Sequence, residues 1–192
     1  MIRHTANNRH WNYLLALDED ASVLARYIEF TPDNFGTYSI ELARLLMAAA
    51  SEVDVVAKLA CAHVSQTQPA SINDYRTVLV PARPLLPGYP VCIPRFGLDL
   101  TPWDNWNAGT NPDWWRAYNL VKHQRDAHFR EANLHNTLNA LAALHVMLIY
   151  AFPEDARLGH LAPPSLLSIP DHGHDGWTSM GTTIHINYRI DS

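Results

Sequence analysis

The clearest pattern of hydrophobic and polar positions lies between residues 37 and 63, a stretch without glycine or proline that is rich in alanine and leucine. This composition has high helix propensity, so we expect a long helix here. On a helical wheel the polar side chains of Arg44, Asp54 and Lys58 gather in one sector, and Glu52 falls in the opposite, apolar sector. Because a buried carboxylate is costly without a partner, we expect Glu52 to be paired near the core.

Further stretches carry regular patterns. Residues 11–30 have apolar spacings that suit one or two short helices, and residues 131–152 predict a second long apolar helix that Pro153 ends. Ser71 is the expected N-cap of a short helix. Residues 183–188 alternate between polar and apolar side chains, which is typical of a strand.

A connector over residues 81–112 holds seven of the thirteen prolines together with Trp103 and Trp106. So long an irregular stretch is unusual inside a compact domain, and residues 89–93 within it resemble a short edge strand. The indole rings offer faces on which nucleic-acid bases can stack. We expect them instead to anchor the connector in the core, which is the commoner role of large aromatic side chains.

The length of 192 residues and the hydrophobic content of 47% allow one substantial core. We therefore expect a single helical domain over residues 1–162, with its core at 37–152. Residues 163–192 are expected to form a peripheral or mobile tail that holds one strand. The predicted fold class is thus an all-α helical bundle with a long Pro- and Trp-rich connector and a short C-terminal tail.

The net charge of −5 argues against a protein that coats nucleic acids nonspecifically, because neutralising phosphates needs clustered lysines and arginines. The sequence has no Walker-type loop, dinucleotide fingerprint, nucleophile elbow or paired-cysteine zinc signature. We interpret Cys61 and Cys92 as free thiols, and the loop with His172 and His174 as able to bind metal only adventitiously. We therefore expect no cofactor and no specific metal site.

No segment approaches the roughly 20 consecutive apolar residues that cross a bilayer, and the N-terminus does not lead into an apolar run. We accordingly expect a cytoplasmic protein without a membrane partner.

The most informative segment is a helix expected to open at residues 111–113 and to carry Arg116, Asn119 and His123. At about 100° per residue, seven steps return to within roughly 20° of the starting direction, so these three side chains share one face. A histidine can accept a proton near neutral pH while an arginine stabilises charge on a phosphoryl group. The three residues are therefore the candidate catalytic residues, and an ordinary solvated helix face is the alternative.

The opposite side of the same helix carries Trp114 and Tyr118, and with them Arg125. We expect this side to pack and Arg125 to be buried with it. The simplest partner for Arg125 is Glu52, since an arginine fork can satisfy a carboxylate through two hydrogen bonds. A contact of Arg125 with Glu41 satisfies the same physics, so the sequence leaves both pairings open.

The spacing of Arg116 and His123, with six residues between them, resembles the HEPN superfamily, whose nuclease members use an arginine, four to six residues and a histidine. The order of helices over residues 37–152 also looks HEPN-like. The resemblance implies a helical bundle that dimerises through the motif face and cleaves RNA without metal, in a bacterial toxin or defence setting. It also implies that His123 transfers a proton, Arg116 contacts the scissile phosphate and Asn119 assists.

One position departs from the family pattern, because Ala117 stands where catalytic members usually have a polar residue. Two alternatives to the nuclease therefore stay open. The first is a noncatalytic helical module that uses the same face to dimerise or to bind a protein partner. The second is a sensor of a small ligand or nucleotide, whose pocket the Trp-rich connector covers.

Overall fold

The computed structural model describes residues 8–180 and 183–191. Residues 1–7 of the predicted domain, and residues 181, 182 and 192 of the predicted tail, lie outside this part. The fold is mostly helical, and two small antiparallel sheets of two strands each accompany the helices. The predicted all-α class is therefore confirmed only in the coarser form of a helix-rich protein.

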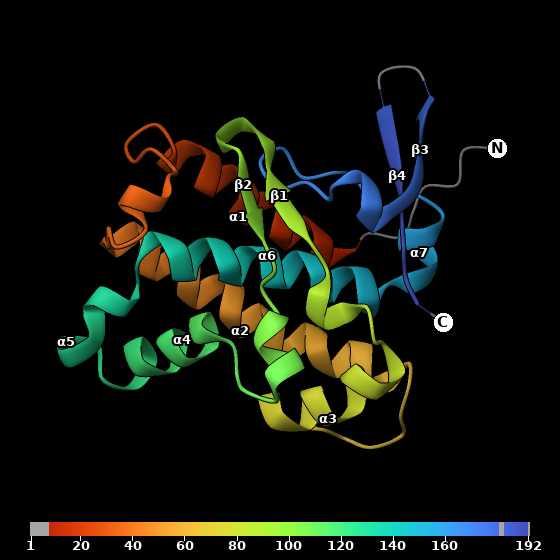
Figure 1. Cartoon of the computed structure of the whole chain (residues 1–192), viewed down its shortest axis with the longest axis horizontal. Coiled ribbons are helices and arrows are strands. Elements are labelled where there is room, and N and C mark those ends of the chain that lie inside the picture. Colours follow the sequence, from red (N-terminus) through yellow and green to blue (C-terminus); the bar gives the residue numbers. More distant parts are fainter. Residues whose placement is uncertain (1–7, 181–182, 192) are drawn as a thin grey trace.

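Two long helices, α2 (Ile40–Ala62) and α6 (Leu134–Ala151), form the centre of the molecule (Figure 1). They run parallel, because Thr137 Oγ1 donates to the Leu42 carbonyl near their starts and His63 Nε2 donates to the Ala151 carbonyl, 2.9 Å away, at their ends. Helix α6 is apolar on nearly all sides and is correspondingly buried on nearly all sides. Both predicted long helices are confirmed, and Pro153 follows α6 closely, as expected.

Helix α1 (Arg9–Leu24) lies antiparallel to α2. His10, near its start, contacts Glu52 on the second half of α2, whereas Asp20, near its end, pairs with Arg44 on the first half. After a single turn η1 (Pro32–Asn34), the chain enters α2. The packing of α1, α2 and α6 forms the main hydrophobic core.

Helix α3 (Ile72–Ala82) begins with a capping box. Ser71 accepts a hydrogen bond from the Asp74 amide, and the Asp74 carboxylate accepts one from the Ser71 amide, so the predicted N-cap is confirmed. Tyr75, a fully buried side chain of α3, donates its hydroxyl proton to Asp54 on α2, 2.7 Å away. This contact and the apolar face of α3 attach the helix to the central pair.

The Pro-rich connector folds as short pieces. These are η2 (Leu86–Gly88), β1 (Val91–Ile93), η3 (Pro94–Phe96), β2 (Leu98–Leu100) and η4 (Asp104–Ala108). Strands β1 and β2 pair antiparallel around a turn in which Gly97 has a φ of 61°, a left-handed conformation that favours glycine. Trp103 and Trp106 are buried with ring centroids 4.3 Å apart. The expectation that these rings anchor the connector is confirmed.

The C-terminal segment continues from α7 (Pro153–Arg157) through η6 (Asp171–Gly173) to a hairpin of β3 (His174–Met180) and β4 (Thr183–Tyr188). The predicted strand is confirmed, and it pairs antiparallel with β3. We expected a peripheral or mobile tail. The hairpin does project from the body (Figure 1), but Leu166, Leu167, Ile169 and Tyr188 are buried in the common core.

The link between α1 and this segment is the carboxylate of Asp18, which is buried. It accepts hydrogen bonds from the backbone amides of Ser165, Leu166 and Leu167 and from the Ser165 hydroxyl, all at 2.8 or 2.9 Å. Trp11 Nε1 donates to the Ala162 carbonyl 2.8 Å away in the same segment. The turn after α7 is therefore fixed to α1 before the hairpin begins.

Candidate functional site

Helix α4 (Asp113–His123) carries the candidate residues, and its rotation is fixed by its aromatic side. Trp114, Tyr118 and Val121 are buried. Trp114 Nε1 donates to the Pro102 carbonyl at 2.8 Å, and its ring meets that of Trp103 edge to face with centroids 5.2 Å apart. Because this side packs in the core, the opposite side of α4 faces outward.

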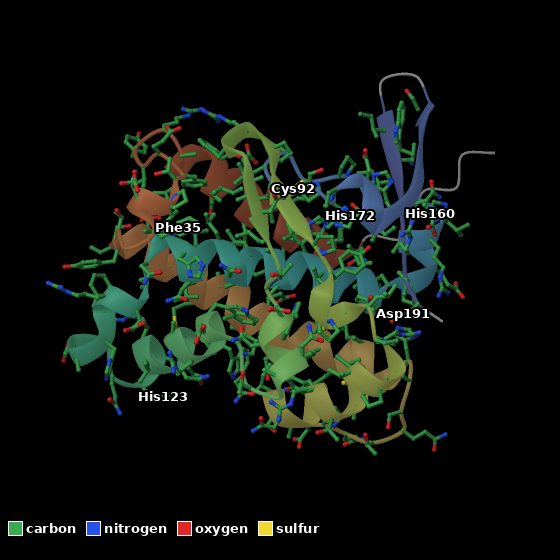
Figure 2. All side chains as sticks on the ribbon, in the orientation of Figure 1. Phe35, Cys92, His123, His160, His172 and Asp191 are labelled. Atoms are coloured by element: carbon green, nitrogen blue, oxygen red, sulfur yellow. The ribbon has the colours of Figure 1, made fainter. Side chains whose placement is uncertain are left out.

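The outward side carries Arg116, Asn119 and His123, as the sequence predicted. Arg116 is 73% exposed and lies 3.3 Å from the Asp113 carboxylate, an exposed pair that contributes little to stability. Asn119 is half-buried, and its amide donates to the Trp115 carbonyl at 2.9 Å. His123 is exposed at the end of the helix, and Figure 2 shows it at the edge of the molecule. The structure therefore places all three on one helix, with the two ends of the motif open to solvent.

The predicted burial of Arg125 and its contact with Glu52 are wrong. Helix α4 ends at His123, and Gln124 breaks it with a φ of −141° and a ψ of 48°. A short helix α5 (Arg125–His128) and the turn η5 (Phe129–Glu131) follow in a new direction. The helical phase that placed Arg125 beside Tyr118 therefore does not extend past residue 123, and the Arg125 side chain is exposed.

Glu52 takes a different partner, His10 at the start of α1. His10 Nδ1 donates to Glu52 Oε1 at 2.5 Å, and the imidazole stacks on the Phe152 ring with centroids 6.2 Å apart. A carboxylate bonded to Nδ1 fixes the orientation of the imidazole ring. Because His10 and Glu52 are 42 residues apart, helical spacing could not predict this pair.

A hollow of about 780 Å³ lies between the start of α2 and α5, next to the end of α4. Arg44, Arg125 and Asp126 are its charged side chains, and its other walls are apolar: Ile40, Ala43, Met47 and Phe129. The two arginines differ in their surroundings. Arg44 is bonded to Glu41 and Asp20, whereas Arg125 has no carboxylate partner in the described part of the chain. Sequence reasoning missed this hollow because it joins segments some 80 residues apart.

Two further cations near this region lie over aromatic rings. Lys122 lies 5.3 Å from the centre of the Tyr118 ring, and Arg130 lies 5.7 Å from that of Tyr38. Cation–π contacts at exposed positions contribute modestly to stability, but they hold long side chains in place. Like Arg125, both cations are exposed, and Asp113, Asp126 and Glu131 lie on the same elements.

Covalent and metal chemistry have little support among the described residues. Cys61 and Cys92 are free thiols, as predicted, and burial raises the pKa of the Cys61 thiol to about 11, which suppresses the reactive thiolate. Within residues 8–180 and 183–191, no three histidine, cysteine or carboxylate side chains gather as metal ligands would. In the same part of the chain, no helix combines the length and apolar character needed to cross a membrane.

No family model, curated protein or solved structure matches this chain.

Proposed function

We propose that the protein is a metal-independent endoribonuclease of HEPN type that acts as a homodimer, with Arg116, Asn119 and His123 in its active site. The observation that carries this proposal is the division of α4 into two faces. Trp114, Tyr118 and Val121 hold one face in the core, while Arg116 and His123 are left exposed on the other. A helix face that binds RNA has to be held in a fixed orientation and open to solvent.

In the proposed reaction His123 transfers the proton, since a neutral imidazole accepts one near pH 7. It takes the proton of the ribose 2′-hydroxyl as the 2′-oxygen bonds to phosphorus. The bond from phosphorus to the 5′-oxygen breaks, and the protonated imidazole returns the proton to that oxygen, which leaves a 2′,3′-cyclic phosphate and a 5′-hydroxyl. Arg116 neutralises the charge that grows on the phosphoryl oxygens, which a guanidinium can contact through two hydrogen bonds. The ion pair of Arg116 with Asp113 is exposed, so a phosphate can replace the carboxylate at little cost.

The requirement for two copies follows from the helix geometry. Arg116 and His123 are seven positions apart, which is roughly 10 Å along a helix axis. One chain thus offers a single cation and a single imidazole at opposite ends of a short face. A two-fold dimer that brings two α4 faces together supplies two of each and closes the space around a phosphate.

A noncatalytic module is the second candidate, and one observation favours it. Ala117, directly after Arg116, is 2% exposed and apolar, so it adds no polar group to the site. In this case the exposed face of α4 binds a second copy or another protein without cleaving RNA. The two candidates differ in a single readout, RNA cleavage.

The experiment is cleavage of a labelled mixed RNA pool in the presence of EDTA. The proteins compared are wild type, His123→Ala, Arg116→Ala and the matched control His172→Ala, which removes an exposed histidine from a distant loop. General acid–base catalysis contributes about 10²- to 10⁴-fold, so we expect a loss of at least about 100-fold in His123→Ala and none in His172→Ala. Far-UV circular dichroism checks that the variants fold equally.

Two results would overturn the nuclease proposal. One is the absence of cleavage by wild type at high enzyme concentration, and the other is equal cleavage by wild type and His123→Ala. Either result favours the second candidate, in which the exposed face of α4 binds a second copy or another protein without cleaving RNA. Light scattering with size-exclusion chromatography then shows whether that module is a dimer.

A further inference from the structure

His145, in the middle of α6, has an imidazole that is fully buried between two other rings. The Trp11 ring of α1 meets it edge-on with centroids 5.5 Å apart, and the Tyr188 ring of β4 meets it edge-on at 5.9 Å. Trp11 and Tyr188 also contact each other, with centroids 6.3 Å apart. These three rings, which we term the His145 cluster, join the helical body to the C-terminal hairpin.

Trp11 Nε1 donates to the Ala162 carbonyl, but the polar side-chain atoms of His145 and Tyr188 have no hydrogen-bond partner among the described residues. Neither ring nitrogen of His145 has a hydrogen bond within the described residues, and the same holds for the Tyr188 hydroxyl. A neutral imidazole brings one donor and one acceptor into the core, and both are left unsatisfied. A charged imidazolium would bring two unsatisfied donors and a full charge, which costs far more.

No charged side chain compensates for this burial. Desolvation is the only cause of the shift in the His145 pKa, which falls from its ordinary value of 6.5 to about 3. The Tyr188 phenol lies against the ring, and because burial raises its pKa it stays neutral. His145 is therefore held uncharged by its surroundings.

Several titratable groups of the elements around the cluster have partners elsewhere in the described part of the chain. On α1, Asp18 binds the amides of residues 165–167, and His10 binds Glu52 of α2. On α2, Asp54 pairs with Lys58. The charged side chains of α4 are exposed, on the face away from the core.

Most titratable groups of the hairpin and of the residues after it also have partners. His174 Nε2 lies 3.5 Å from the Asp171 carboxylate, but its buried Nδ1 has no hydrogen bond within the described residues. His185 donates to the Gly159 carbonyl, Arg189 pairs with Asp175, and Asp191 accepts from the Leu85 amide. No charged group of the described residues contributes to the shift of the His145 pKa, so a proton taken up by its ring would find no acidic partner there.

The most deeply buried described side chain of the hairpin, that of Tyr188, belongs to this cluster. The flanking residues are held separately, Gly173 by the Tyr89 hydroxyl and Asp191 by Arg83 and the Leu85 amide. Outside the His145 cluster, most bonds of the hairpin to the body are exposed or half-buried, such as those of His185 with Gly159 and of Asn187 with the Arg157 carbonyl. Contacts of this kind are individually weak. Tyr188, 1% exposed, is the side chain that fixes β4 in the core.

We propose that His145 is an acid-sensitive latch, such that protonation of its ring releases the β3–β4 hairpin from α1 and α6. Helix α6 is packed on α1, α2 and α4 and cannot move away, whereas the hairpin projects from the body (Figure 1). Withdrawal of Tyr188 is therefore the movement that brings water to the imidazole at the smallest loss of packed surface.

The direction and size of the response follow from the two pKa values. Between pH 6.5 and 3, the released form binds a proton at His145 and the docked form does not. A fall in pH therefore favours release, by about tenfold per pH unit in this window. Between pH 7.5 and 4.5 the fraction of released hairpin increases about 100-fold.

The test is hydrogen–deuterium exchange at pH 7.5 and 4.5, corrected for the intrinsic pH dependence of exchange. We expect hairpin amides of wild type to lose about 100-fold of their protection at pH 4.5 while α2 and α6 keep theirs. The variant His145→Phe retains a buried ring without titratable nitrogens, so its hairpin should be equally protected at both pH values. The control His185→Gln removes a different histidine of the hairpin and should respond as wild type does.

Three results would overturn the proposal. These are an unchanged hairpin in wild type at pH 4.5, the same loss of protection in His145→Phe, and a simultaneous loss of protection in α2 and α6, which would indicate global unfolding. If His145→Phe does not fold, the proposal is tested on the wild-type protein alone. A nuclear magnetic resonance titration of the His145 ring must then show proton uptake at the same pH as hairpin release, and separate midpoints would refute the latch.

Discussion

Replacing Asp18 by alanine tests how the C-terminal segment is attached to α1. The Asp18 carboxylate is 1% exposed, and it accepts four hydrogen bonds from three consecutive residues. In Asp18→Ala these donors lose their acceptor. Ser165 is exposed, so its amide and hydroxyl can turn to water, but the bonds of the Leu166 and Leu167 amides are buried.

The magnitude follows from those two buried amides. A hydrogen bond to a charged group contributes about 1.5 to 3 kcal/mol, and the loss of one partner leaves the other unsatisfied in the core. Two such losses amount to about 3 to 6 kcal/mol, a range that includes the roughly 3 to 5 kcal/mol that breaking a buried ion pair costs. This is a large part of the 5 to 15 kcal/mol that stabilises a typical domain.

The assay is equilibrium unfolding in urea, which measures the free energy of unfolding of each variant. Asp20→Ala is the matched control, because Asp20 lies on the same helix in an exposed pair with Arg44, and its loss should cost at most about 1 kcal/mol. Asp18→Asn should fall between them, since an amide accepts through one oxygen only. A cost below about 1 kcal/mol for Asp18→Ala would refute the reasoning.

Three further substitutions test the contact of Gly159 with the hairpin and the pairing of Glu52 with His10 rather than Arg125. Gly159 has a φ of 67°, and a Cβ there would lie 3.1 Å from Cβ of His185, so Gly159→Ala should lower the free energy of unfolding by about 1 to 2 kcal/mol in the same urea assay. An unchanged free energy of unfolding would show that the close approach of Gly159 to His185 and its positive φ do not restrict this position to glycine. Arg125→Ala should change stability by less than about 0.5 kcal/mol because the side chain is exposed, whereas Glu52→Ala should cost about 1 kcal/mol through the loss of the His10 contact. A double-mutant cycle that coupled Arg125 to Glu52 by more than about 1 kcal/mol would contradict the structure.

The candidate site shows which features can be predicted from local sequence spacing and which cannot. Arg116 and His123 lie within one uninterrupted helix, where a fixed rotation per residue sets their relative direction, so their common outward face could be predicted. Arg125 is only two residues further on, but Gln124 breaks the helix between them. The prediction for Arg125 was wrong because helical phase has no meaning across such a break.

The sequence by itself determined the two long helices, the cap at Ser71 and the two faces of α4, because each depends on residues within a few positions of one another. Only the tertiary structure decided that Glu52 contacts His10, that Asp18 holds a segment 147 residues away and that Tyr188 encloses His145. These contacts join side chains from separate elements. Their partners are chosen by how the elements pack, and helical or strand periodicity contains no information about that choice.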